Sequence, residues 1–85
     1  MQPINAIQFI MSSPQFMNIM THNQVDPNYC LGIKLRRIRD EIGGYSYYEV
    51  YFDYGNPDLS AKDVVATVRI ITNNRFQLVQ IRSVQ

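Results

Sequence analysis

Charge is missing from the start of this chain. The first 25 residues contain no Asp, Glu, Lys or Arg, and only 18% of all 85 residues are charged. A secretory signal needs a positive segment before an unbroken apolar run, and polar residues interrupt every apolar run here. No run approaches the roughly 18 apolar residues that a membrane-spanning helix needs. We therefore expect no membrane segment and a cytoplasmic location.

Residues that carry metal and nucleophile chemistry are scarce as well. Cys30 is the only cysteine, which excludes an internal disulfide, and His22 is the only histidine. A metal site needs three or four close ligands, and these two residues with Asp26 make only a weak triplet. Glu49 and Asp53 lie too far apart along one segment to act as a catalytic carboxylate pair. We expect no catalytic residue, no metal and no cofactor, and therefore a protein that is not an enzyme.

The composition that remains is that of one small folded domain spanning residues 1–85. Apolar residues make up 46% of the chain and the formal net charge is +1, so no general attraction to polyanions is expected. A domain of this length buries only about 60–65% of the surface of its unfolded chain. Oligomerisation or a bound partner is therefore a reasonable source of extra stability.

Helical spacing dominates the N-terminal half. Ile4, Ile7 and Met11 recur at helical intervals, and Ser13 followed by Pro14 is typical of a cap and first position of a second helix. Asp26 and Pro27 repeat that signal before an apolar series at intervals of four, three and four: Leu31, Leu35, Ile38 and Ile42. We expect two or three helices within residues 3–42. Gly32 opposes a helix there by about 1 kcal/mol.

After Gly43 and Gly44 the apolar period changes from helical to alternating. The pattern predicts a three-stranded antiparallel meander at residues 45–54, 63–72 and 75–84, on which the helices pack to form an α+β domain. If residues 31–42 are instead a strand, the sheet has four strands and the two glycines lie in a hairpin turn. The stretch "GGYSYYEVYFDYGNP" marks the first predicted strand of the meander and contains five of the six tyrosines.

Asn73 and Asn74 are suited to a two-residue hairpin loop, which predicts the register of the last two strands. In that register Ile71 faces Phe76, Ile70 faces Gln77, Val68 faces Val79 and Ala66 faces Ile81. One face then carries Val64, Ala66, Val68, Ile70, Val79 and Ile81, a set suited to lie under the helices. The second face carries an aromatic and aliphatic series that is too apolar for free exposure to water.

Tyrosine has an apolar ring and a polar tip, which suits a surface that is sometimes covered. Three interpretations are open: pairing of the rings within the sheet, a protein interface, or stacking of nucleic-acid bases. We take the protein interface as the functional hypothesis. Its candidate partner-binding residues are Tyr45, Tyr47, Tyr51, Phe76, Leu78, Arg69 and Arg82.

The basic run "KLRRIR" supports an alternative function. On a helix, Asp40 would lie within reach of Arg37, and cations near the C-terminal end would interact favourably with the helix dipole, so a solvated structural role is one interpretation. The other is contact with an acidic partner or a phosphate backbone through Lys34, Arg36, Arg37 and Arg39. Together with the tyrosines, this cluster gives the alternative of a nucleic-acid-binding protein.

The sequence thus predicts a small interaction protein that occupies a surface of a larger macromolecule, as inhibitors and adaptors of phages and mobile elements do. We also expect a two-fold homodimer, formed through the second sheet face or through an uncharged, methionine-rich surface at Phe16, Met17 and Met20. The competing interpretation of these three side chains is that they form the core beneath the sheet. No family resemblance emerges from the motifs.

Overall fold

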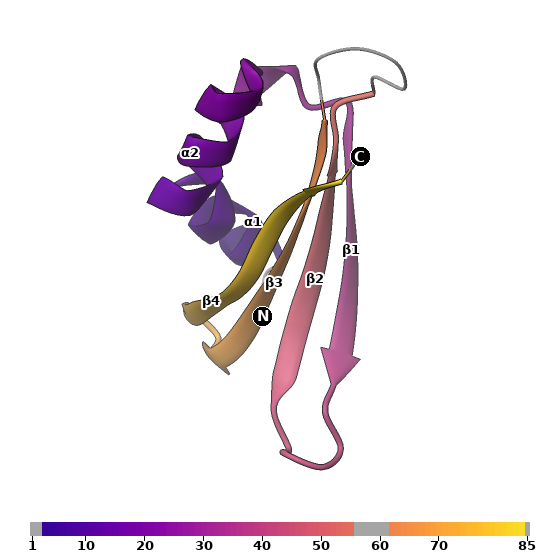
Figure 1. Cartoon of the computed structure of the whole chain (residues 1–85). Helices are drawn as coiled ribbons and strands as arrows, with labels where there is room; N and C mark the ends of the chain where they lie inside the picture. The colour runs from indigo at the N-terminus through magenta and orange to yellow at the C-terminus, as the bar shows by residue number, and fades with distance from the viewer. Residues whose placement is uncertain (1–2, 56–61, 85) are drawn as a thin grey trace.

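Two helices precede a four-stranded antiparallel sheet in the computed structural model, which describes residues 3–55 and 62–84 (Figure 1). In chain order the elements are α1 (Pro3–Met11), α2 (Pro14–Asn23), the 3-10 turn η1 (Pro27–Tyr29), β1 (Gly32–Arg39), β2 (Ser46–Asp53), β3 (Asp63–Thr72) and β4 (Arg75–Val84). Each strand pairs with the next one in the chain, so the spatial order is β1-β2-β3-β4. The α+β class is confirmed, and the four-stranded alternative replaces the three-stranded meander.

The break between the helices lies where the sequence predicts it. Ser13 caps α2 in an extended conformation, and its Oγ accepts a hydrogen bond of 3.2 Å from the amide of Phe16. Pro14 occupies the first turn, where it sacrifices no backbone hydrogen bond. The helix ends at Gln24, whose left-handed φ of 58° directs its amide back to the last carbonyls. These local interactions turn the chain between two short helices.

The prediction of a third helix across residues 31–42 is wrong. Asp26 and Pro27 do start a helical turn, but it ends at Tyr29, and Gly32–Arg39 form β1. In an extended segment Leu31 and Leu35 lie on one face and Ile38 and Ile42 on the other, a pattern that counts against a strand with one buried face. That objection fails for an edge strand, since water reaches both of its faces and no strict alternation is required. All eight residues of β1 pair with β2 in one register, from Gly32↔Asp53 to Arg39↔Ser46.

The connection between β1 and β2 contains the two glycines. Asp40 donates its amide to the Tyr45 carbonyl at 2.8 Å, and its own carbonyl accepts from Gly44 at 2.7 Å. Gly44 has a φ of 77°, which a glycine adopts without steric cost. Asp40 Oδ1 also accepts from the amide of Ile42. The expected hairpin turn of the four-stranded alternative is therefore present.

The register of the last hairpin is partly wrong. Its loop is Asn73–Asn74 and Ala66 pairs with Ile81, as predicted, but Ile70 pairs with Phe76. The pairing shifts twice, once between Ile70 and Thr72 and once between Thr67 and Val68. The first shift adds a residue to β3, and the second adds one to β4, which restores the register.

The shifted register moves two residues predicted for the surface onto the inner face, where they are partly buried. Phe76 and Leu78 lie on the face that the helices cover, whereas Val79 is 55% exposed. The ring of Phe76 contacts that of Phe9 from α1, with centroids 5.7 Å apart. Packing against a helix is the interaction that turn geometry alone could not reveal.

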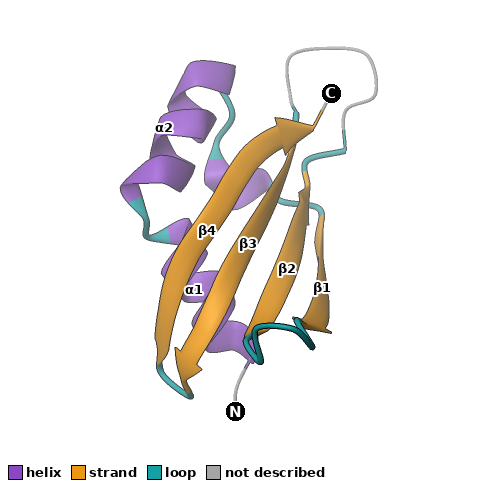
Figure 2. Ribbon diagram, turned by 60° about the horizontal axis from the view of Figure 1, so that its bottom comes forward, coloured by secondary structure: helices purple, strands orange, loops and turns teal. Residues whose placement is uncertain are grey.

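Both helices lie on one side of the sheet (Figure 2), and the core consists of side chains from these helices and from β2 and β3. Phe16 and Phe52 meet at its centre with ring centroids 5.1 Å apart, and both are completely buried. The buried apolar residues are Ala6, Ile10, Phe16, Met20, Tyr48, Val50, Phe52, Tyr54, Val64, Ala66 and Val68. Two residues predicted for self-association, Phe16 and Met20, thus belong to the core, and only Met17 is exposed.

Candidate interaction surface

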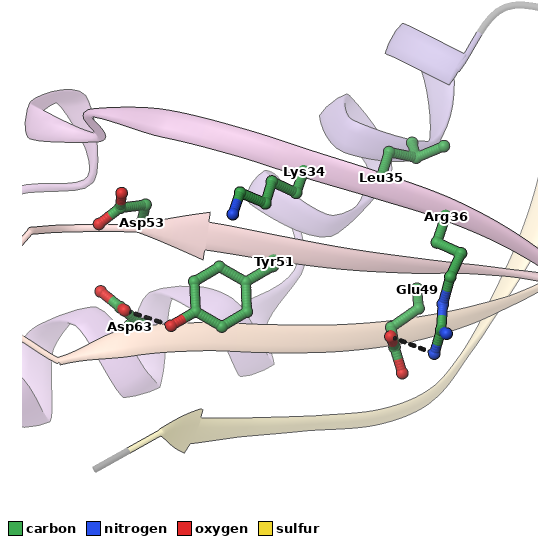
Figure 3. A pocket seen from close by; sticks show the side chains of 7 residues that line it. All are labelled: Lys34, Leu35, Arg36, Glu49, Tyr51, Asp53 and Asp63. Carbon is green, nitrogen blue, oxygen red and sulfur yellow. Dashed lines mark hydrogen bonds and ion pairs between the residues drawn. The ribbon is translucent and has the colours of Figure 1, made fainter.

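The face of the sheet opposite the helices is the candidate site, and we call it the outer sheet face (Figure 3). Alternate residues of each strand point to it because successive side chains of a strand alternate between faces. Within the described part of the chain, both helices lie on the other side. Its side chains include Lys34, Arg36, Ile38, Tyr47, Glu49, Tyr51, Asp53, Asp63, Val65, Thr67, Arg69 and Arg82.

The tyrosines of residues 45–54 divide between the two faces. Tyr48 and Tyr54 are buried in the core. The hydroxyl of Tyr54 donates to the Pro27 carbonyl at 3.2 Å, and burial raises the pKa of Tyr54 to about 12. Tyr47 and Tyr51 lie on the outer sheet face, and Tyr45 joins them through Arg69. Three of the five tyrosines therefore remain for a surface role.

Tyr51 is anchored to the end of β3. Its hydroxyl donates a hydrogen bond to Asp63 Oδ2, while Asp63 Oδ1 accepts from the amide of Tyr54 at 2.9 Å. The hydrogen bond from Tyr51 holds the pKa of Asp63 below its ordinary value, and the same bond raises the pKa of Tyr51. At neutral pH the phenol therefore stays protonated and the carboxylate ionised. A pair shifted in these directions stabilises structure and is poorly placed to exchange protons.

Tyr45 and Arg69 form a second anchored pair. The guanidinium carbon of Arg69 lies 4.4 Å from the centre of the Tyr45 ring, within the range of a cation–π interaction. Arg69 Nε is buried and has no hydrogen-bond partner within the described part of the chain. One face of the ring is thus occupied by a cation of the same chain, which leaves the opposite face and the edges for another contact.

The basic cluster is split by the extended conformation of β1. Lys34 and Arg36 point to the outer sheet face, opposite Tyr51 and Glu49 of β2, whereas Arg37 and Arg39 have the opposite parity. Arg36 forms an ion pair of 2.9 Å with Glu49, and the two side chains are 69% and 38% exposed. A strand therefore unites the basic and tyrosine features that the sequence placed on separate elements.

A shallow depression of about 510 Å³ lies among these side chains. Its walls combine cations with carboxylates, because Asp53 and Asp63 stand at the neighbouring ends of β2 and β3 near Lys34 (Figure 3). The charge is therefore mixed, unlike the uniformly basic groove that tracks a phosphate backbone. Sequence reasoning missed Asp63, although its place at the start of an alternating apolar run marked it as a strand end.

The remaining predicted partner-binding residues occupy different places. Arg82 is exposed and pairs across the sheet with Val65 on the outer sheet face. Phe76 and Leu78 lie on the inner face, on the opposite side of the sheet from the three surface tyrosines. The expected surface is consequently less apolar and more charged than the sequence suggested.

No group of three His, Cys, Asp or Glu side chains suited to a metal ion occurs among residues 3–55 and 62–84. The thiol of Cys30 donates toward the Gly32 and Asp53 carbonyls at 3.2 and 3.6 Å. Neither helix in the described chain has the length and hydropathy needed to cross a membrane.

The comparisons with known proteins add no assignment. No protein-family model matches the chain, and no curated protein or solved structure shows significant similarity to it. The functional argument rests on the surface itself.

Proposed function

We propose that the protein is a small, non-enzymatic protein–protein interaction module that works in the cytoplasm by occupying a surface of a larger partner, as an inhibitor or adaptor does. The observation that carries this proposal is the outer sheet face, where Tyr45, Tyr47 and Tyr51 stand among Arg36 and Arg69 with no described helix over them. Tyrosine and arginine are enriched at protein interfaces, where they supply both apolar area and directed polar contacts.

The mixed charge of the surface favours a protein partner. Glu49, Asp53 and Asp63 lie among the cations, and a phosphate backbone would be repelled by each of them. A protein can match both signs with its own side chains, which gives specificity of orientation. The anchoring of Tyr51 and Tyr45 also reduces the entropy lost when a partner covers them.

Nucleic-acid binding is the second candidate, and one observation favours it. Because β1 is a strand, Lys34 and Arg36 lie beside the tyrosines on one open sheet face. Rings for stacking and cations for phosphates are the two components of a single-strand binding surface. Binding of this kind weakens steeply with salt, whereas a mixed-charge protein interface depends on salt less strongly.

Capture of partners from native lysate by wild type and by Tyr47→Lys tests the proposal. A protein retained by wild type and lost with Tyr47→Lys is expected, since a lysine on the outer sheet face removes the ring from the contact. Met17→Lys is the matched control, because Met17 is exposed on α2 at the helical side. Equal capture by all three chains would contradict the proposed surface. Salt-sensitive binding of single-stranded oligonucleotides, lost with Tyr47→Lys, would favour the second candidate.

We also propose that the protein forms a two-fold homodimer through the outer sheet face. Burial of Phe16 and Met20 leaves the outer sheet face as the better of the two expected contacts. Tyr47→Lys should then dissociate the dimer without unfolding it, while Met17→Lys leaves it intact. Sedimentation of wild type as a monomer at high micromolar concentration would overturn the dimer.

A further inference from the structure

The two edge strands of the sheet, β4 and β1, differ in how they are protected against pairing with another strand. β4 is irregular at Val79, and Asn23 of α2 donates a 3.0 Å hydrogen bond to Ser83 Oγ near its end. Bulges and covering elements of this kind prevent another strand from pairing with an edge. β1 has neither among residues 3–55 and 62–84, since its eight residues pair regularly with β2 and contain no proline (Figure 2). An extended segment could therefore add to the sheet at β1.

Hydrogen-bond alternation identifies the available backbone groups. The bond from the Asp40 amide to the Tyr45 carbonyl continues the β1–β2 register, so even-numbered residues of β1 exchange hydrogen bonds with β2. The amide and carbonyl groups of Ile33, Leu35 and Arg37 then point away from the sheet. Three consecutive outward positions form a template for a strand of six or so residues.

Charge indicates what can pair there. β1 carries Lys34, Arg36, Arg37 and Arg39 and no acidic residue, and only Arg36 forms an ion pair among the described side chains. A second copy of this chain is a poor occupant, since antiparallel pairing centred on Leu35 would place Lys34 opposite Arg36 twice. Like charges directly opposite each other destabilise a sheet, and opposite charges stabilise it.

The face of β1 that points toward the helices sets a second requirement for the side chains of a pairing segment. Ile33 is 39% exposed and Leu31 is 72% exposed, so the apolar surface beyond the core is incompletely covered at this edge. Leu35 continues it along the strand and packs against the core. An aliphatic side chain beside Ile33 and Leu35 would extend the core by one strand.

We infer that the β1 edge binds an extended acidic segment of a partner protein, in which Asp or Glu alternates with aliphatic residues. The acidic side chains lie beside Lys34 and Arg36 on the outer sheet face, and the aliphatic ones lie beside Ile33 and Leu35. The inference rests on the proposed interaction function and specifies the partner chemistry. It uses a backbone edge that the tyrosine contact does not require.

The probe is an eight-residue peptide of alternating glutamate and valine, with the lysine–valine peptide as its charge control. Amide exchange followed by NMR is the readout. In the free protein the amides of Ile33, Leu35 and Arg37 should exchange faster than those of Lys34, Arg36 and Ile38. The acidic peptide should slow the three fast amides, and added salt should weaken the effect, while the lysine peptide should leave them unchanged.

Two variants separate backbone pairing from charge attraction. Leu35→Pro removes an outward amide, which an edge strand tolerates, and should abolish binding. Lys34→Glu keeps the backbone and should weaken binding by roughly tenfold through charge reversal. Arg75→Glu makes the same charge change at the start of β4 and should bind as wild type does. If Leu35→Pro does not fold, the exchange pattern and Lys34→Glu still decide the question.

Absence of amide protection at millimolar acidic peptide would overturn the inference. Equal loss of affinity for Lys34→Glu and Arg75→Glu would do the same, since it would indicate attraction to net charge alone. Protein capture that still depends on Tyr47 would leave the proposed function standing in either case. If wild type and Tyr47→Lys capture partners equally while the peptide still binds at β1, the proposed role of the outer sheet face is refuted. The inference about the β1 edge then stands.

Discussion

β3 and β1 are both strands rich in aliphatic residues, yet they are stabilised differently. Val64, Ala66 and Val68 of β3 are completely buried beneath the helices, whereas Ile33 of β1 is 39% exposed. β3 pairs with a strand on each side, and β1 pairs, among the described strands, with β2 alone. The comparison shows that β3 is held by packing on one face and by strands on both sides, while β1 depends mainly on backbone pairing with β2.

Replacement of a core ring should have the largest effect on stability. Phe16→Ala should lower the free energy of unfolding by about 3–5 kcal/mol, because it leaves a cavity against Phe52. Ile33→Ala is the comparison in β1, and a partly exposed side chain should cost about 1 kcal/mol or less. Chemical denaturation measures both. Equal losses would show that β1 is packed as tightly as the covered strands.

Tyr51→Phe tests the hydrogen bond that links the end of β3 to β2. Its loss should lower stability by about 1 kcal/mol at neutral pH. The pKa of Asp63 is lower in the folded protein, so its stabilising contribution is present above the ordinary value of 3.8 and is lost as the pH falls below it. Tyr51 has a raised pKa, and its contribution is lost only as the pH rises above 10.0.

Denaturation of wild type and Tyr51→Phe at neutral and acidic pH measures this difference. The gap between the two chains should narrow as the pH falls below 3.8, because protonation of Asp63 removes the same interaction. Tyr47→Phe is the matched control, since Tyr47 makes no hydrogen bond to a carboxylate of residues 3–55 or 62–84. A gap that stays constant with pH would show that the Tyr51 hydroxyl acts independently of the Asp63 charge.

The smallest effect is expected for the ion pair that joins β1 to β2. Arg36 and Glu49 lie 2.9 Å apart but are substantially exposed, so their coupling should be about 0.2–1 kcal/mol and should fall with salt. A double-mutant cycle of Arg36→Gln and Glu49→Gln measures it. Coupling well above 1 kcal/mol, unaffected by salt, would mean that β1 is held by electrostatics to an unexpected degree.

Local signals explain which parts of the fold could be predicted. Ser13 and Pro14 indicate the start of α2 through capping, and Asn73 and Asn74 indicate a tight loop. Both signals are local, because these residues act on their immediate neighbours. The alternation in β2 and β3 is equally informative, since one face of each is buried. β1 lacks such a face, so its apolar residues fitted a helix at least as well as a strand.

For the candidate site, the sequence indicated the residue types but not their arrangement in space. The tyrosines and the basic cluster stood out in the sequence, but a helical reading of residues 31–42 placed them on different elements. Strand pairing brings Lys34 opposite Tyr51 and Arg36 opposite Glu49. The same pairing adds Asp63, which lies 12 residues after Tyr51 in the chain and bonds to it in space.

The sequence by itself determined the two N-terminal helices, the Asn73–Asn74 loop, and the alternation that separates the two faces of β2 and β3, because these depend on neighbours within a few residues. Only the tertiary structure decided that residues 32–39 extend, that Phe76 turns inward to Phe9, and that Phe16 and Met20 belong to the core. Those outcomes depend on strand pairing and on helices packed from distant segments, where contact free energy outweighs weak local preference.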